Sequence, residues 1–223
     1  MSAVARVKNA AGSSRAPRGV YVITPDWADT QRLERAVSAA IRGGAGAIQY
    51  RNKSASAGLR REQAEALARI TQSAGLAFFV DDDPALAIAV GADGVHIGQA
   101  DGDAATVRAQ LPAAMMLGIS CYADLGRVER AVQLGAAYVA VGAMFSSKTK
   151  PAAALASVDI IGQALQRGAH VVASGGIDRQ NIAAVAAAGA HAVGVVSAVF
   201  DAEMPDRATA ALAELFASGV GPT

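Results

Sequence analysis

Short runs rich in Val, Ile and Ala recur along the chain from residue 19 onward, and each is followed by a longer stretch whose apolar residues fall at helical spacing. The runs predict strands at residues 20–24, 47–51, 77–81, 94–98, 116–120, 138–142, 170–174 and 192–197. Most are continuously apolar rather than alternately apolar and polar, which is typical of a parallel sheet covered on both faces. This alternation of strand and helix patterns constrains the fold more than any other feature of the sequence.

The stretches between the runs predict helices, for example at residues 32–42 and 60–74, and several end in Gly-Ala or Gly-Gly just before the next strand. Eight strand-helix units in roughly 200 residues are typical of a closed (β/α)8 TIM barrel. A doubly wound open sheet is the alternative, but equal units offer no point at which the strand order would reverse. Because no linker-like segment divides the units, we expect a flexible arm at residues 1–18 and a single catalytic barrel domain at residues 19–223.

The composition is that of a soluble globular protein: of 223 residues, 52% are apolar and 17% are charged, with a formal net charge of +1. This near-neutral balance, without a dense Lys/Arg tract, predicts no nucleic-acid partner. No segment is apolar for long enough to cross a bilayer, and the N-terminal arm lacks the apolar stretch of a secretory signal. We therefore expect no membrane partner and a cytoplasmic location, and the sequence leaves open whether the chain forms a homo-oligomer.

Polar side chains gather where the predicted strands end, which in a TIM barrel is the face that carries the active site. In the segment IQYRNK, Gln49, Arg51 and Lys53 are spaced two apart, so they should project from one face of an extended chain. Arg51 belongs to a strand expected to be buried, where an unpaired charge is costly. That position favours a role in binding an anion, to which Lys150 after the sixth strand would add a further cation.

Two carboxylates, Asp82 and Asp101, follow the third and fourth strands. Because those strands are neighbours, the carboxylates should lie on one side of the barrel mouth, where they would suit Mg²⁺ bridging to a polyphosphate. The alternative is that the acidic residues are solvated or cap helices, since Asp83-Pro84 resembles a helix start. Both interpretations remain open at the level of sequence.

Glycines after the seventh strand provide a third signal. Gly175 and Gly176 precede a predicted helix, so their backbone N–H groups could approach a phosphate, with Val196 and Ser197 at the next strand end. Barrels of this kind often bind phosphate between strands seven and eight.

The histidines and the single cysteine carry weaker signals. His96 lies inside a strand, where a core position is at least as compatible as a catalytic one. His170 and His191 fall near strand starts, on the face opposite the expected site. Cys121 has no histidine near it in the pattern, which argues against an activated thiolate, and one cysteine excludes an internal disulfide.

Six motifs occur in order: IQYRNK, DDDPALAIAVGADGVHIGQAD, GISCY, FSSKTKP, ASGGI and VVSA. Through them the chain resembles the thiamine-phosphate synthase family, also called thiamine-phosphate pyrophosphorylase, from about residue 19 to residue 216. The resemblance implies a barrel transferase of thiamine biosynthesis that uses Mg²⁺. In its reaction, 4-amino-2-methyl-5-hydroxymethylpyrimidine diphosphate loses pyrophosphate while the ring nitrogen of a thiazole phosphate bonds to the exposed methylene, which gives thiamine phosphate.

The resemblance also implies roles for individual residues. The pyrimidine diphosphate would be contacted by Gln49, Arg51 and Lys53, its pyrimidine side by Ser120, and the departing pyrophosphate by Lys150. The metal would be bound by Asp82 and Asp101. The thiazole phosphate would be contacted by Ser147 and Thr149 and by the backbone of Gly176, Val196 and Ser197. No protein nucleophile is required, which fits a site without a Ser-His or Cys-His pair.

Two positions depart from the family pattern. Asp81, a predicted substrate-binding residue, stands where the family usually has Asn, which adds negative charge where a neutral amide would contact the diphosphate. Ser146-Ser147, followed by Lys148, stands where the family commonly has Pro-Thr or Pro-Ser after Phe. We therefore expect the electrostatics beside the diphosphate and the stiffness of the sixth loop to differ from the family pattern.

Three other functions compete with this interpretation. A related thiazole tautomerase shares the barrel but uses a histidine just after the serine of the fifth strand, where this chain has Cys121 and Tyr122. A catalytically silent phosphate-binding homologue would not need the cations and carboxylates to be retained together. A phosphosugar isomerase or epimerase would need an acid/base pair that the sequence does not supply.

Overall fold

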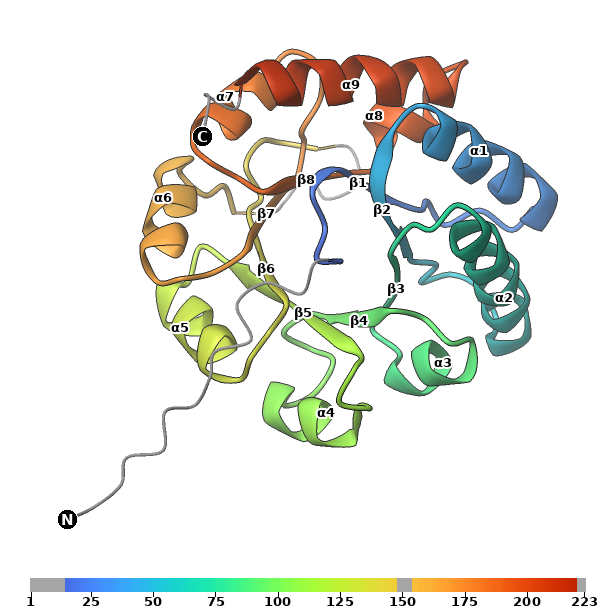
Figure 1. The fold of residues 1–223 in the computed structure, drawn as a ribbon, viewed down its shortest axis with the longest axis horizontal. Coiled ribbons are helices and arrows are strands. Elements are labelled where there is room, and N and C mark those ends of the chain that lie inside the picture. Colours follow the sequence, from blue (N-terminus) through green and yellow to red (C-terminus); the bar gives the residue numbers. More distant parts are fainter. Residues whose placement is uncertain (1–14, 148–153, 220–223) are drawn as a thin grey trace.

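A computed structural model describes residues 15–147 and 154–219. Its strands are parallel and form a closed barrel in sequence order, in which β1 is hydrogen-bonded to both β2 and β8 (Figure 1). The strands are β1 (Gly19–Ile23), β2 (Ala45–Tyr50), β3 (Phe78–Asp81), β4 (Gly94–Ile97), β5 (Met116–Tyr122), β6 (Tyr138–Val141), β7 (Val171–Ser174) and β8 (Ala192–Val195). The predicted TIM barrel is confirmed, and the open sheet is excluded because the first and last strands pair.

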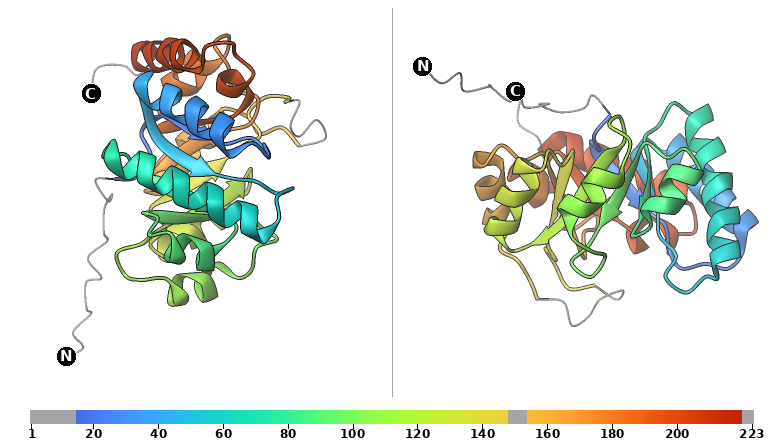
Figure 2. Two further views of the ribbon diagram at one scale, coloured as in Figure 1. Left: turned by 90° about the vertical axis from the view of Figure 1, so that its right-hand side faces the viewer. Right: turned by 90° about the horizontal axis from the view of Figure 1, so that it is seen from below.

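Helices form a ring outside the strands (Figure 1 and Figure 2). They are α1 (Thr30–Arg42), α2 (Ala57–Ser73), α3 (Pro84–Ala89), α4 (Ala104–Gln110), α5 (Leu125–Gln133), α6 (Asp159–Gln166), α7 (Ile182–Ala187), α8 (Ser197–Phe200) and α9 (Pro205–Gly219). Apolar faces of these helices pack on the outer side chains of the strands and form the larger part of the core. None of the described helices combines the length and the apolar character needed to cross a membrane.

Several predicted element boundaries are shifted by a few residues. The strand predicted at residues 47–51 is β2, which ends at Tyr50, so Arg51 lies just beyond it. The strand predicted to reach residue 197 ends at Val195, and Ser197 instead begins α8. These differences do not move any side chain away from the carboxyl ends of the strands.

Aromatic rings fill the interior of the barrel. Tyr21, Phe79 and Tyr138 meet edge to face, with ring centroids 5.4–5.7 Å apart, and all three are fully buried. Gly118 on β5 makes room for them, because a Cβ atom at this position would collide with the ring of Tyr138. The same arrangement closes the barrel below the site and defines its floor.

The described part of the predicted N-terminal arm packs against the opposite face of the barrel. Arg15 forms an ion pair with Asp93 at 2.6 Å, and Nε2 of His170 donates to the carbonyl oxygen of Pro17 at 2.7 Å. Residues 1–14 of the arm lie outside the described part of the chain. The contacts that are described hold the chain just before β1 against the starts of other strands.

His170 and His191 lie on this same face, as predicted, and their rings stack with centroids 4.1 Å apart. The backbone N–H of Val171 donates to Nδ1 of His191 at 3.0 Å, so this nitrogen is unprotonated. Burial lowers the pKa of both histidines, that of His170 to about 4. The pair is therefore neutral and serves the structure of the barrel base rather than the site.

Candidate active site

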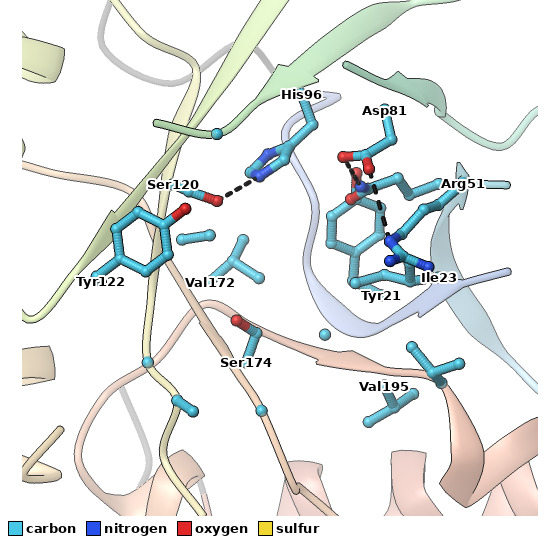
Figure 3. Close-up of a pocket in the computed structure, with 18 of the residues that line it drawn as sticks. Tyr21, Ile23, Arg51, Asp81, His96, Ser120, Tyr122, Val172, Ser174 and Val195 are labelled. Carbon is cyan, nitrogen blue, oxygen red and sulfur yellow. Dashed lines mark hydrogen bonds and ion pairs between the residues drawn. The ribbon is translucent and has the colours of Figure 1, made fainter. Parts of the chain in front are cut away.

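A cavity of about 290 Å³ opens at the carboxyl ends of the strands (Figure 3). The predicted site residues that line it are Gln49, Arg51, Lys53, Asp81, Asp82, Asp101, Ser120, Ser147, Gly176, Val196 and Ser197. Thr149 and Lys150 fall outside the described residues. Side chains that the sequence separates by more than 140 positions thus share one cavity of a size suited to small molecules.

Gln49 and Arg51 converge on one carboxylate, as their spacing predicts. Nε2 of Gln49 donates to Oδ1 of Asp81 at 2.7 Å, and Nε of Arg51 lies 3.8 Å from Oδ2 (Figure 3). The Arg51 side chain is only 18% exposed, so its charge needs this compensation. Burial, followed by the negative charge of Asp82, raises the pKa of Asp81 to about 7.

Asp26 also belongs to this cluster, although the sequence analysis did not identify it. Its Oδ1 accepts from Nη1 of Arg51 at 3.0 Å and from the backbone N–H of Lys53 at 2.9 Å. Asp26 follows β1 just as Arg51 follows β2, and these strands are neighbours. Its position at a strand end was the signal that could have revealed it.

Lys53 and Asp82 form the closest ion pair of the cavity, with Nζ 2.7 Å from Oδ2. Burial works against ionisation of Asp82, but the hydrogen bonds to Lys53 and Asp101 and the charge of Lys53 together outweigh it and lower the pKa of this carboxyl. Asp82 has a φ of +61°, a conformation that Asp tolerates better than most residues and that turns its side chain at the end of β3.

Asp82 and Asp101 lie within hydrogen-bonding distance of each other. Burial, followed by this bond, raises the pKa of Asp101, while its Oδ2 accepts from the N–H of Gly98 at 2.7 Å. Helix capping is done instead by Asp83 and Asp103, which accept from Leu86 and Thr106 at 2.9 Å. The capping alternative therefore applies to their neighbours and not to Asp82 and Asp101.

The donor set at Asp82 and Asp101 fits Mg²⁺. Two carboxylates close enough to share a proton can instead share a divalent cation, and Mg²⁺ prefers oxygen ligands. Within the described residues, no group of three or more His, Cys, Asp or Glu side chains could hold a metal. Water and substrate oxygens would have to complete the coordination, as is usual for Mg²⁺ in phosphate chemistry.

Ser120 ends a chain of hydrogen bonds that starts in the barrel interior, and Figure 3 shows its last bond, between His96 and Ser120. Its Oγ bonds to Nε2 of His96 at 2.9 Å, Nδ1 of His96 bonds to the hydroxyl of Tyr138 at 2.9 Å, and that hydroxyl meets Tyr21 at 2.9 Å. His96 is 7% exposed. It is thus a satisfied core histidine that also lines the cavity and orients Ser120. The expectation of a site without a Ser-His pair is therefore wrong, because the fold brings these two residues from β4 and β5 into contact.

The glycine-containing loop lies on the other side of the cavity, after β7. The N–H groups of Met144 and Phe145 donate to the carbonyls of Ser174 and Gly175, both at 3.0 Å, so two backbones run against each other. A Cβ atom on Gly176, whose φ is +65°, would collide with the backbone of Phe145. Only glycine allows this close approach, which brings β6 and β7 loop backbone to the cavity.

The residue after Ser120 is not a reactive thiol. Cys121 is fully buried, and burial raises its pKa to about 12. Tyr122, the next residue, lines the cavity. The described cavity therefore contains neither an activated cysteine nor the tautomerase base.

A family model described as thiamine monophosphate synthase matches residues 20–199, which is most of the chain. The chain belongs to the thiamine monophosphate synthase family. The resemblance inferred from the six motifs is thus confirmed. Membership in the thiamine monophosphate synthase family also agrees with a cavity that combines cations, paired carboxylates and a close-packed glycine loop.

Relatives of the same family cover nearly the whole chain. A thiamine-phosphate synthase from Bordetella pertussis is 46% identical over 215 residues, which are 93% of this chain and 98% of the relative. One from Halorhodospira halophila is 48% identical over 191 residues, covering 85% and 90%. Among solved structures, thiamine phosphate pyrophosphorylase from Pyrococcus furiosus matches with a TM-score of 0.82 at 30% identity, covering 94% of this chain and 100% of that one.

Proposed function

We propose that the chain couples 4-amino-2-methyl-5-hydroxymethylpyrimidine diphosphate with a thiazole phosphate to give thiamine phosphate and pyrophosphate. The observation that carries the proposal is the division of one cavity into two differently charged parts. The ends of β2, β3 and β4 supply two cations and three carboxylates, whereas the ends of β7 and β8 supply Gly176, Val196 and Ser197. A diphosphate with its metal suits the first part, and a monophosphate held by backbone groups suits the second.

The residue types match the chemistry of this substitution. The bond between the methylene carbon and the diphosphate oxygen breaks, the oxygen keeps the electron pair, and the thiazole nitrogen forms the new bond to carbon. An electron-rich aminopyrimidine stabilises positive charge on that methylene, so the demanding task is to stabilise the leaving diphosphate. Arg51 and Lys53, together with Lys150 from the sixth loop, would do this electrostatically, and no protein nucleophile is needed.

Asp82 and Asp101 would hold Mg²⁺, which when bound supplies further positive charge against the diphosphate oxygens. Lys53, which is paired with Asp82 in this structure, would then be available to contact the diphosphate. Gln49, Asp81 and Ser120 would contact the pyrimidine diphosphate, Ser120 being oriented by His96. Ser147 and Thr149 would contact the thiazole phosphate.

The direct test supplies both substrates and Mg²⁺ and measures two products, pyrophosphate by an enzyme-coupled assay and thiamine phosphate by oxidation to a fluorescent derivative. We expect the two in equal amounts. Pyrophosphate without thiamine phosphate would indicate hydrolysis and overturn the proposal; neither product would favour a silent phosphate-binding barrel.

A tautomerase is the second candidate, because the related enzyme shares the barrel and its phosphate site. The thiazole precursor alone, followed by proton NMR, should show no isomerisation by this chain, since Tyr122 replaces the required base. The cytoplasmic location and a homo-oligomeric state stay predictions.

A further inference from the structure

Tyr122 is an exposed aromatic side chain at the mouth of the cavity. Its exposed fraction is 42%, and among the described residues the other large hydrophobic side chains of comparable or greater exposure, Ile88, Leu155 and Met204, are aliphatic. None of those three lines the cavity, whereas Tyr122 does. A tyrosine ring left partly open to solvent beside a small-molecule cavity offers a flat apolar face to a ligand.

The backbone around Tyr122 holds the ring in place at a conformational cost. Tyr122 has a φ of +54°, a left-handed conformation that residues with a bulky side chain rarely adopt. The pairing of β5 with β6 shifts register between Ser120 and Tyr122, which marks a bulge. Strain of this kind persists where surrounding contacts impose it, and it is concentrated at functional sites.

Arg127 supplies those contacts. Its Nε and Nη2 both donate to the carbonyl oxygen of Ser120, at 3.3 and 3.1 Å, and its guanidinium carbon lies 5.8 Å from the centre of the Tyr122 ring. The carbonyl of Tyr122 accepts from the N–H of Gly142 at 3.2 Å. The bulge is therefore fixed on both sides, and the ring has a defined position.

The ring lies across the cavity from Arg51 and Asp81, and its hydroxyl reaches the loop at Gly98, near the carboxylate of Asp101. Figure 3 has Tyr122 and Ser120 on one side, and Arg51 and Asp81 on the other. The nitrogen that attacks the methylene must approach from the side away from the departing diphosphate. The ring that contains this nitrogen would therefore occupy the part of the cavity that faces Tyr122 and the loop at Gly176, with the pyrimidine between it and Arg51.

We propose that Tyr122 is a specificity-determining residue whose ring forms the wall against which the five-membered acceptor heterocycle lies. This inference rests on the proposed function, because it takes the acceptor to be a thiazole phosphate. The tyrosine hydroxyl is not required for it. The face of the ring would make the contact with the heterocycle, and the strained backbone would hold the ring in position.

The test compares Tyr122→Gly, Tyr122→Asn and Tyr122→Phe with Ile88→Ala, a control of similar exposure at 43% on α3, outside the cavity. The KM of each substrate is measured separately, and binding of thiazole phosphate alone is measured by calorimetry. Loss of an aromatic contact should raise the KM and Kd of thiazole phosphate about fivefold to tenfold in the Gly and Asn variants. The KM of the pyrimidine diphosphate should stay within about twofold, and Phe should resemble the wild type.

The melting temperature provides the readout that separates recognition from structure. Gly and Asn both tolerate a positive φ, so neither variant should melt below the wild type, and Gly should melt at the same or a higher temperature. A lower melting temperature with both substrates affected equally, or a larger effect on the pyrimidine diphosphate, would overturn the proposal. So would unchanged constants in the Gly and Asn variants.

The two proposals fail in different ways. If the wild type forms no thiamine phosphate, the proposed function is wrong, while calorimetry with thiazole phosphate still tests whether Tyr122 contacts this ligand. If the wild type binds thiazole phosphate and the Tyr122→Gly variant binds it equally well, only the proposed role of Tyr122 is wrong. If the wild type forms thiamine phosphate but does not bind thiazole phosphate in the absence of the second substrate, the KM values decide.

Discussion

Nζ of Lys53 lies 2.7 Å from Oδ2 of Asp82, so a cation expected to bind diphosphate is paired with a carboxylate expected to bind Mg²⁺. Arg51 is likewise paired, with Asp26 at 3.0 Å. Without substrate, the positive and negative groups thus compensate one another. A magnesium diphosphate brings both a cation for Asp82 and an anion for Lys53, and it can exchange these ion pairs for new ones.

Asp101 should control the affinity for Mg²⁺. In the Asp101→Asn variant, loss of a charged ligand should raise the Mg²⁺ concentration for half-maximal activity by about tenfold or more. The shift of melting temperature with added Mg²⁺ should weaken in parallel. Asp103→Asn is the matched control, since Asp103 caps α4 and does not line the cavity. Equal Mg²⁺ dependence in the wild type and Asp101→Asn would remove Asp101 from the metal site.

Asp81 should make binding of the pyrimidine diphosphate depend on pH. Its pKa is raised to about 7, so the carboxyl is mostly neutral at pH 6 and mostly ionised at pH 8, where it repels the diphosphate. The wild-type KM should therefore rise about threefold to tenfold between these values. Asp81→Asn, which removes the titratable group and can still accept from Gln49, should flatten this rise. Parallel profiles for the two proteins would contradict the assignment.

Gly118 should be required for the aromatic interior. In Gly118→Ala the new methyl group meets the ring of Tyr138, which should cost about 1–3 kcal/mol of unfolding free energy measured in urea. Activity should also fall, because displacement of Tyr138 disturbs the chain of hydrogen bonds to Ser120. Gly162→Ala is the control: this glycine lies in α6 with open space around its Cα, so alanine should stabilise by about 0.5–1 kcal/mol.

His170 should make the protein less stable in acid. Its pKa is lowered to about 4 in the folded state, so the unfolded chain binds the proton more readily, and stability present above pH 6.5 is lost as the pH falls toward 4. Urea unfolding should lose about 1–2 kcal/mol over this range from this group. His170→Gln does not titrate and can still donate to Pro17, so its loss of stability should be smaller. An identical slope in both proteins would show that other groups cause it.

The barrel could be predicted from the sequence because its signals are local. Continuous apolar runs and helical spacing each occupy a few consecutive residues, and eight of them at similar spacing admit few folds. The strand ends then indicated which side chains would meet, and Gln49, Arg51 and Asp82 do share a cavity. Errors of one or two residues at element ends did not matter, since the loop after β2 carries Arg51 in the expected direction.

The remaining features depend on contacts between distant parts of the chain. The contact of Asp26 with Arg51 joins residues 25 positions apart, and the hydroxyl contact of Tyr21 with Tyr138 joins residues 117 positions apart. No pattern within a segment predicts such pairs. Tyr122 likewise combines a positive φ with contacts from Arg127 and Gly142, which lie on other elements, and no local pattern in the sequence indicates that backbone conformation.

Tyr21 and Tyr138 both fill the barrel interior and line the cavity, so the same two side chains belong to the hydrophobic core and to the wall that meets substrate. A smaller residue at either position would deepen the pocket but leave a void in the buried interior of the barrel. Variants selected for bulkier pyrimidines should therefore arise at the rim, where side chains are replaceable, rather than at the base. The depth of the pocket is therefore fixed by side chains that the barrel needs for its stability, and changes in substrate range should come from substitutions around the opening.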